Sequence, residues 1–247
     1  MENLNKVTKI TMLFWIMKIV ATTLGETLGD YLSMTLNLGY FVGILITFLF
    51  FTLVLANQLR AKKFIPTSYW LVIIATTTLG TEISDFLDRS LQLGYAVGSC
   101  FLLMSLVLVL FLWFKKYSSL AVYPIFDTTK ELYYWIAILF SNSLGTAFGD
   151  FLSDVLGFSY LTGALVTASI IVFVLLLHYC TKINEILLFW IAFIFTRPFG
   201  ATFGDFLTKP IAKGGLNLGT LNASLTALFL MACLILFSHW QLKKIQK

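Results

Sequence analysis

The chain has 247 residues, of which 59% are hydrophobic and only 12% are charged, and its formal net charge is +5. A charged fraction of about half the usual value excludes an ordinary soluble domain and favours a polytopic membrane protein. The basic residues lie in short clusters between apolar runs, so they indicate membrane topology and no nucleic-acid partner. The three cysteines lie inside apolar runs without paired spacing, which argues against disulfides and thiolate metal sites.

Four tandem repeats are visible from the spacing of tryptophans. Trp15, Trp70, Trp135 and Trp190 each lie ten residues before the first glycine of a Gly-rich, Asp-ending motif. Each repeat is about long enough for two membrane helices of roughly 20 residues. First helices are predicted near 10–36, 68–91, 132–156 and 185–208, and second helices near 39–58, 93–114, 159–179 and 217–240. The fold class is therefore an all-α polytopic membrane protein, with eight transmembrane helices as four parallel two-helix repeats.

The repeats cover about 10–60, 65–116, 130–181 and 185–241, and together they form one membrane domain over 1–247. A very short turn is expected within the first hairpins, at Asn37-Leu38-Gly39 in the first copy, and a longer break from Lys209 to Gly215 is expected in the last. The pair Gly214-Gly215 is aligned with Gly39-Tyr40, which opens the second apolar run. Twelve basic residues lie at the ends of the chain or between hairpins, and only three lie near turns within hairpins. The positive-inside rule then predicts that both termini are cytoplasmic, in the bacterial inner (plasma) membrane. Lys18 is expected to snorkel to the cytoplasmic face.

The repeated motif reads Leu24-Gly-Glu-Thr-Leu-Gly-Asp30 in the first copy and recurs around Asp85, Asp150 and Asp205. Its small residues predict close helix packing of the Gly-x-x-x-Gly type. The predicted packing glycines are Gly25, Gly29, Gly80, Gly145, Gly149, Gly200 and Gly204, with Ser84 in place of the second glycine of unit two. Packing does not explain the aspartate that follows the second small residue in every copy. The tryptophans are placed at the cytoplasmic interface, so each aspartate lies about 22 Å away, in the outer half of the membrane.

Two thirds of the twelve acidic residues lie in the motif regions, where membrane burial makes them costly. We therefore expect them to face the bundle interior, where seven are candidate cation ligands: Glu26, Asp30, Glu82, Asp85, Asp150, Asp154 and Asp205. Three bases, Arg89, Arg197 and Lys209, are candidate counter-ions or gating residues. Units one and three have no base close in sequence to their aspartates. Asp30 and Asp150 are accordingly the favoured ligands, whereas Asp85 and Asp205 are assigned to the frame or a gate.

Carboxylates with hydroxyl and amide neighbours, and without nearby Cys or His, suit hard divalent cations. The sequence therefore predicts a transporter that exports or exchanges a divalent cation, with Mn²⁺ as the first choice and with protons as a coupling ion. One alternative is a proton-coupled exporter of small organic or cationic molecules, and a second is a membrane scaffold without transport. No enzyme activity and no cofactor are expected, because four equivalent acidic copies suit a pathway better than a two-aspartate protease site. The predicted partners are the lipid bilayer, the cation and protons, and the oligomeric state stays open.

With its repeated Gly-Asp motifs, the chain resembles a family of uncharacterised bacterial inner-membrane proteins described only as membrane-anchored. The resemblance covers essentially the whole chain and implies no reaction. The stretch Glu26-Thr27-Leu28-Gly29-Asp30 is also similar to the Glu-x-Gly-Asp signature of small calcium/manganese exporters. It differs by one extra residue before Gly29 and by the absence of the Lys-Thr that follows in that signature.

Overall fold

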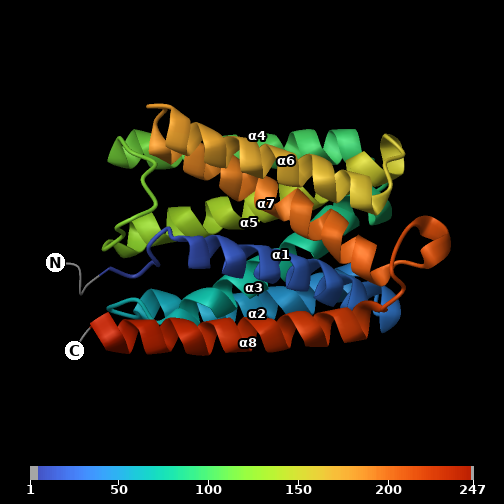
Figure 1. Ribbon diagram of the computed structural model, residues 1–247, viewed down its shortest axis with the longest axis horizontal. Helices are drawn as coiled ribbons and strands as arrows, with labels where there is room; N and C mark the ends of the chain where they lie inside the picture. The colour runs from blue at the N-terminus through green and yellow to red at the C-terminus, as the bar shows by residue number, and fades with distance from the viewer. Residues whose placement is uncertain (1–4, 246–247) are drawn as a thin grey trace.

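The computed structural model describes the backbone of residues 5–245 and the side chains of residues 5–244. This part of the chain is all-helical and has no strand (Figure 1). Its eight long helices are α1 (Met12–Asp30), α2 (Tyr40–Arg60), α3 (Pro66–Asp85), α4 (Tyr95–Tyr117), α5 (Thr128–Asp150), α6 (Tyr160–Cys180), α7 (Glu185–Thr208) and α8 (Thr220–Ile245). Short π-helical segments follow α1, α3 and α5 at Tyr31–Thr35, Phe86–Ser90 and Phe151–Val155, and a 3-10 turn occupies Ile211–Lys213.

The hairpin turns show how local sequence ends the first helix of a unit and starts the second. In unit one, Asn37 has φ 55° and Gly39 has φ 75°, a left-handed conformation that glycine and asparagine adopt most readily. Asn217 and Gly219 repeat this geometry in unit four, with φ 55° and 74°. The alignment of Gly214-Gly215 with Gly39-Tyr40 was therefore wrong in register, although the longer break in the last copy is present. A longer link after α7 displaces the equivalent turn to Asn217-Leu218-Gly219.

The first helices of the four units form an inner ring in chain order. Helix α1 packs against α3, α3 against α5, α5 against α7, and α7 closes the ring on α1. Each second helix packs on the first helix of the next unit, so α2 lies on α3, α4 on α5, α6 on α7, and α8 on α1. The described chain begins and ends at the same end of the bundle, and the hairpin turns lie at the opposite end (Figure 1). These ends are called the terminus end and the turn end below.

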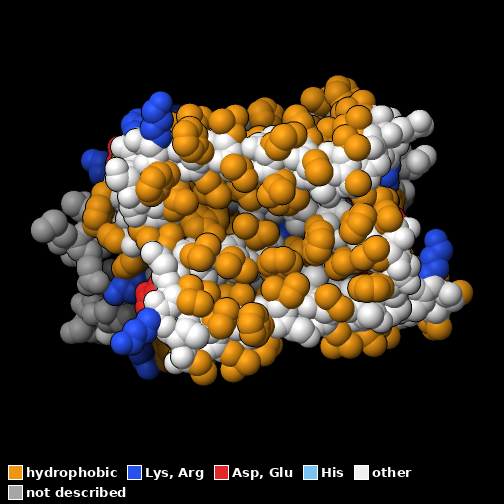
Figure 2. Space-filling view, turned by 90° about the horizontal axis from the view of Figure 1, so that it is seen from above, with side chains coloured by type: hydrophobic (Ala, Val, Ile, Leu, Met, Phe, Trp, Pro, Cys, Tyr) orange, Lys and Arg blue, Asp and Glu red, His pale blue; other side chains and the backbone are white. Residues whose placement is uncertain are grey.

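Hydrophobic side chains are spread along the face of the bundle shown in Figure 2. Seven of the eight long helices in the described chain are long and apolar enough to cross a membrane, which identifies an integral membrane protein by length and composition. Helix α5 falls outside this set, since it carries the polar run Ser141-Asn142-Ser143 and the acid Glu131. The outer helices expose large side chains such as Phe41 and Phe101, as a lipid-facing layer would.

Three of the four repeated tryptophans are buried in the interior of the bundle, and Trp15 is half-buried. Trp70 and Trp135 are fully buried in the main core cluster, and Trp190 is 5% exposed. Tyr69 packs edge-on against Trp70 with ring centroids 5.3 Å apart, and the hydroxyl groups of Tyr69 and Tyr134 form a hydrogen bond. The repeated tryptophans thus take part in aromatic packing between inner helices.

A buried ion pair ties the N-terminal segment to the rest of the terminus end. The Lys6 ammonium lies 3.0 Å from Glu131 Oε2, and the Glu131 side chain is fully buried. Gln58 donates a hydrogen bond to Glu131 Oε1 at 2.9 Å, and Lys6 donates another to the carbonyl oxygen of Leu59 at 3.0 Å. The network therefore joins the N-terminal segment, the end of α2 and the start of α5.

Replacing Lys6 by methionine is expected to lower the free energy of unfolding by about 3–5 kcal/mol, because it leaves the Glu131 carboxylate buried without its cation. The measurement is denaturant or thermal unfolding of the protein in detergent micelles. Lys62→Met, which removes an exposed lysine from the adjoining loop, is the matched control and should unfold like the wild type. Equal stability of the Lys6 and Lys62 variants would contradict the structural role given to the pair.

Candidate functional site

The four motif aspartates lie at the turn end of the inner ring. Asp30, Asp85 and Asp150 are the last α-helical residues of α1, α3 and α5, and a π-helical segment follows each of them directly. Asp205 lies one turn before the end of α7, which stays α-helical to Thr208. All four side chains are buried, with residue exposures between 2% and 6%. Widened π-turns often occur at functional positions, and here the widening begins at the residue after the acid.

The first glycine of each motif lies where two inner helices touch. A methyl group at Gly25 would come within 2.8 Å of the Thr77 carbonyl carbon, and one at Gly200 within 2.8 Å of the Thr22 carbonyl carbon. A methyl group at Gly80 would lie 3.0 Å from the Ser143 backbone nitrogen, and one at Gly145 would lie 2.9 Å from Pro198 Cδ. A methyl group at the second glycine of a motif would also lie 3.0–3.1 Å from a side chain of the neighbouring helix. The facing pairs are Gly29 with Thr81, Gly149 with Ala201, and Gly204 with Glu26. Each unit thus packs on the next through the same motif positions, with unit four on unit one.

Each of two bases bridges its own aspartate and an aspartate of the next unit around the ring. Lys209 Nζ lies 3.0 Å from Asp205 Oδ1 and 2.7 Å from Asp30 Oδ2. Arg89 holds the equivalent place between units two and three, with Nε 3.6 Å from Asp85 and Nη2 3.1 Å from Asp150. The inference that units one and three carry uncompensated acids was therefore wrong. Their counter-ions come from the neighbouring unit, which sequence spacing alone does not reveal.

Lys209 lies just beyond α7, and its ammonium is embedded between the two carboxylates. Burial alone would lower the pKa of Lys209, but the charges of Asp30 and Asp205 outweigh that effect and raise it above its usual value. Lys209 therefore stays protonated through the physiological pH range. It acts as a tethered monovalent cation within the acidic site.

Arg197 forms the deepest ion pair of the site. Its Nη2 lies 2.8 Å from Glu26 Oε2, and the Arg197 side chain is fully buried. The same guanidinium donates hydrogen bonds to the Thr81 hydroxyl and, at 3.4 Å, to the Thr22 carbonyl oxygen. Arg197 is thus a counter-ion to a buried carboxylate, and it connects α7 with α1 and α3.

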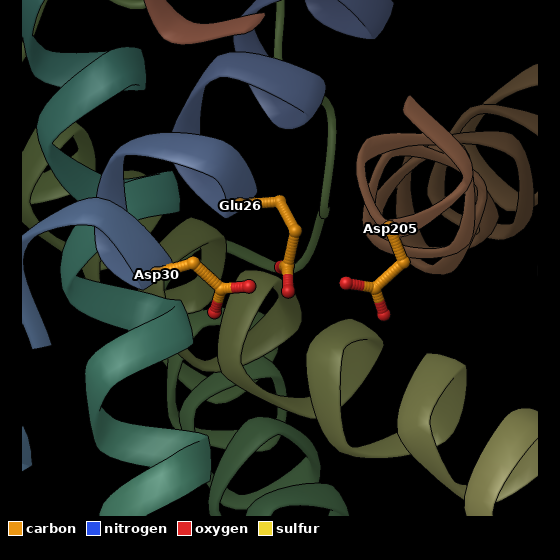
Figure 3. Close-up of side chains that lie close together, drawn as sticks. All are labelled: Glu26, Asp30 and Asp205. Carbon is orange, nitrogen blue, oxygen red and sulfur yellow. The ribbon is translucent and has the colours of Figure 1, made fainter. Parts of the chain in front are cut away.

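Three carboxylates from two helices converge next to this pair. Glu26 and Asp30 on α1 and Asp205 on α7 each offer one oxygen atom, and these atoms lie within 4.8 Å of one another. Figure 3 shows the three side chains pointing toward a common space between the two helices. In the described chain this is the one group of three such residues close enough to share a metal ion. We call Glu26, Asp30 and Asp205 the acidic cluster.

The other four predicted ligands lie outside the acidic cluster. Asp85 and Asp150 pair with Arg89, and the Asp150 carboxylate accepts its hydrogen bond. Asp154 is 45% exposed and accepts a hydrogen bond of 2.6 Å from the Tyr95 hydroxyl. Glu82 is fully buried against Gly43 of α2. Of the two favoured ligands, the structure therefore places Asp30 in the acidic cluster and Asp150 outside it. Asp205, which was expected to have a structural or gating role, lies beside Asp30 in the acidic cluster.

Lys18 is a polar core residue whose environment the sequence did not reveal. It is fully buried, so the expected snorkelling to the membrane surface is wrong. Its ammonium donates to Asn142 Oδ1 at 2.9 Å and lies 4.0 Å from the centroid of the Phe193 ring. Asn142 in turn donates to the Thr76 hydroxyl at 3.1 Å. The sequence signal for a buried Lys18 is its spacing of eight residues from Glu26, which puts both side chains on one face of α1.

The sequence profile described as "Repeat of Unknown Function (DUF347)" matches four segments of the chain, residues 13–64, 68–117, 133–184 and 188–243. The chain belongs to this repeat family. The four matches agree with the four tandem repeats predicted from tryptophan and glycine spacing. No curated protein and no solved structure matches the chain. Membership in the DUF347 family therefore establishes the repeat architecture and assigns no chemistry to the site.

Proposed function

We propose that this DUF347 protein transports a divalent cation across a membrane through its inner helix ring, with the acidic cluster as the cation site. The observation that carries the proposal is the convergence of Glu26, Asp30 and Asp205 within 4.8 Å, all buried inside a bundle with an apolar surface. Buried acids in membrane helices are costly and mark ion pathways by default. An all-oxygen ligand set suits Mg²⁺, Ca²⁺ and Mn²⁺, and Mn²⁺ is the first ion to test.

Charge balance at the turn end supports a cation as substrate. Seven described carboxylates are buried there, and three cationic side chains accompany them: Arg89, Arg197 and Lys209. Together these charges leave a negative interior when all are ionised, and a low-dielectric surrounding strengthens its attraction for cations. A divalent ion that enters the acidic cluster would compete with the Lys209 ammonium for Asp30 and Asp205. Displacement of Lys209 by the cation is the step we assign to transport.

A polar column inside the ring supports a route beyond the acidic cluster. Toward the terminus end the Glu26–Arg197 pair is followed by Lys18, Asn142 and Thr76. Lys18 precedes Glu26 by eight residues, or about 12 Å of helix rise. The column thus continues the polar lining of the ring from the acidic cluster into the middle of the bundle.

The proposed topology has eight spans, with α5 enclosed by its neighbours and both termini in the cytoplasm of a bacterial cell. Support comes from the position of both described chain ends at one end of the bundle (Figure 1). Lysines flank the outer helices at that same end: Lys62 and Lys182 lie in links, and Lys115 lies in the last turn of α4. An excess of Lys and Arg at one end of the spans is typical of the cytoplasmic side. This rule supports an acidic cluster in the outer half of the membrane.

A second candidate substrate is a small organic amine or guanidine, exported in exchange for protons. It is favoured by the side chains that occupy the two bridging positions: an ammonium group between Asp30 and Asp205, and a guanidinium group between Asp85 and Asp150. A free alkylammonium ion could replace Lys209 without a change in the ligand geometry. Inhibition of Mn²⁺ flux by alkylamines, at concentrations at which tetramethylammonium has no effect, would favour this class.

The test in cells compares manganese accumulation with and without the protein. Cells that express the wild type are expected to show altered Mn²⁺ content and Mn²⁺ sensitivity, and cells that express Asp30→Asn or Asp205→Asn should match the empty-vector strain. Asp154→Asn, which removes an exposed acid outside the acidic cluster, is the control that should retain the effect. Equal metal content in all strains at verified expression would argue against divalent-cation transport.

A further inference from the structure

Glu82 is a buried carboxyl group for which neither the cation site nor the ion-pair network accounts. It lies on α3 with its residue fully buried, and neither carboxyl oxygen has a hydrogen-bond partner. The group points toward α2, where Gly43 provides the space that it occupies. A methyl group at Gly43 would come within 2.6 Å of the Glu82 carboxyl carbon and within 2.7 Å of Oε1. The position is thus shaped for this side chain at the contact between an inner and an outer helix.

The charged groups that face Glu82 are negative. Helix α1 contributes Glu26 and Asp30, and Asp85 lies one turn further along α3 itself. Their own cations are directed elsewhere: Arg197 to Glu26, Lys209 to Asp30, and Arg89 to Asp85. No Lys, Arg or His of the described chain lies within ion-pair distance of Glu82.

The remaining helices that pack on α3 offer no counter-charge either. On α2 the facing residue is Gly43, and the nearest titratable group is the Tyr40 phenol, which accepts a hydrogen bond from Arg89. On α5, Asp150 is paired with Arg89. On α8, His239 contacts Thr67 at the terminus end. An ionised Glu82 would therefore be an unpaired buried charge beside other negative charges, which is far costlier than a neutral carboxyl group.

We infer that Glu82 is a proton-binding site, separate from the acidic cluster, and that its carboxyl group is protonated at neutral pH. In the neutral form the side chain has the shape and polarity of glutamine, so it fits the space beside Gly43 without a cation. Glu82 lies on α3, which packs directly against the helix that carries Asp30. Loss of the Glu82 proton would therefore add a negative charge beside the acidic cluster. Proton release from Glu82 would thus favour cation entry, and proton uptake would favour cation release.

The assignment of the proton as coupling ion rests on the proposed cation transport, whereas the protonation of Glu82 does not. The direct test is infrared difference spectroscopy of purified protein at pH 7, which separates the C=O band of protonated carboxyl groups from carboxylate bands. Relative to the wild type, the Glu82→Gln spectrum is expected to lose the C=O intensity of one protonated carboxyl group. Asp154→Asn, an exposed acid, should leave that region unchanged. A Glu82→Gln spectrum with an unchanged protonated-carboxyl region would overturn the inference.

Three further measurements test the inference. Because glutamine mimics a protonated glutamate, Glu82→Gln should unfold at the wild-type midpoint, and a strong loss of stability would contradict a neutral Glu82. Gly43→Ala should shift or remove the Glu82 band, whereas Gly163→Ala, at the equivalent place on α6, should not. If the wild type transports Mn²⁺, Glu82→Gln should bind the ion but lose the response of flux to a pH gradient. If the wild type shows no transport, the infrared result still decides the protonation.

Discussion

Replacing Arg197 by methionine is expected to destabilise the protein by about 3–5 kcal/mol, because the change leaves Glu26 as an unpaired charge in the centre of the bundle. Arg197 is fully buried, and its guanidinium group connects α7 to Glu26 and Thr22 on α1 and to Thr81 on α3. The loss should appear as a lower unfolding midpoint in detergent. It should be among the largest effects of any single substitution in the inner ring.

The double variant Glu26→Gln/Arg197→Met separates the ion pair from simple packing. If the cost of the single change comes from the stranded carboxylate, neutralising Glu26 should recover a large part of the stability. The expected coupling between the two sites is at least about 1–3 kcal/mol, which is typical of residues within one ion-pair network. Additive effects of the two changes would show that Arg197 stabilises the ring without its charge.

Replacing Lys209 by methionine is expected to strengthen Mn²⁺ binding at least about tenfold, which corresponds to about 1.4 kcal/mol. The reason is that the Lys209 ammonium, 2.7 Å from Asp30 and 3.0 Å from Asp205, competes with the incoming cation for the same oxygen atoms. Equilibrium binding of Mn²⁺ to the purified protein can be followed by the electron paramagnetic resonance signal of the free ion. Lys213→Met, an exposed lysine in the same link, is the matched control and should bind like the wild type.

A Lys209→Met variant with unchanged or weaker affinity would contradict the competition. Arg89→Met gives a second comparison, because Arg89 holds the equivalent bridging position near Asp85 and Asp150, outside the acidic cluster. The Arg89 change should therefore affect stability more than Mn²⁺ affinity. The contrast between the two variants tests which pair of units binds the cation.

Much of the architecture could be predicted from the sequence, because it depends on periodic local signals. Apolar runs of about 20 residues between basic links predict the helices, and the motif glycines predict close helix contacts. Both features repeat in each unit, so they are visible without knowledge of the fold. The four helical repeats and the packing position of Gly25 and its equivalents follow from these signals.

The pairing of charges could not be predicted, because it depends on contacts between units. Lys209 and Asp30 lie 179 residues apart, and they meet only because α7 closes the ring on α1. For the same reason sequence spacing favoured Asp150 as the partner of Asp30, whereas the structure brings Asp205 beside Asp30. Lys18 was misplaced for a different reason: a lysine near the end of a predicted span can either snorkel or be buried in a bundle core, and hydropathy does not distinguish the two.

Four similar units thus produce a ring whose halves differ. Lysine bridges units four and one, and arginine bridges units two and three, so the ring has two related but unequal bridged pairs of aspartates. Lysine is a flexible point charge on a long stem, whereas the planar arginine fork is better suited to a fixed pairing. This difference supports the location of a displaceable cation site beside Lys209 and of a structural pair at Arg89.

Manganese flux into liposomes that contain only the purified protein tests cation transport through the acidic cluster most directly. Wild-type protein should move Mn²⁺ down an imposed gradient faster than empty liposomes. Asp205→Asn, reconstituted in equal amount and with the same unfolding midpoint, should reduce the flux to the level of empty liposomes, while Asp154→Asn should not. Flux that is equal in the wild type and Asp205→Asn would remove the acidic cluster from the pathway. A wild-type flux no greater than that of empty liposomes would contradict transport and favour a structural role in the membrane.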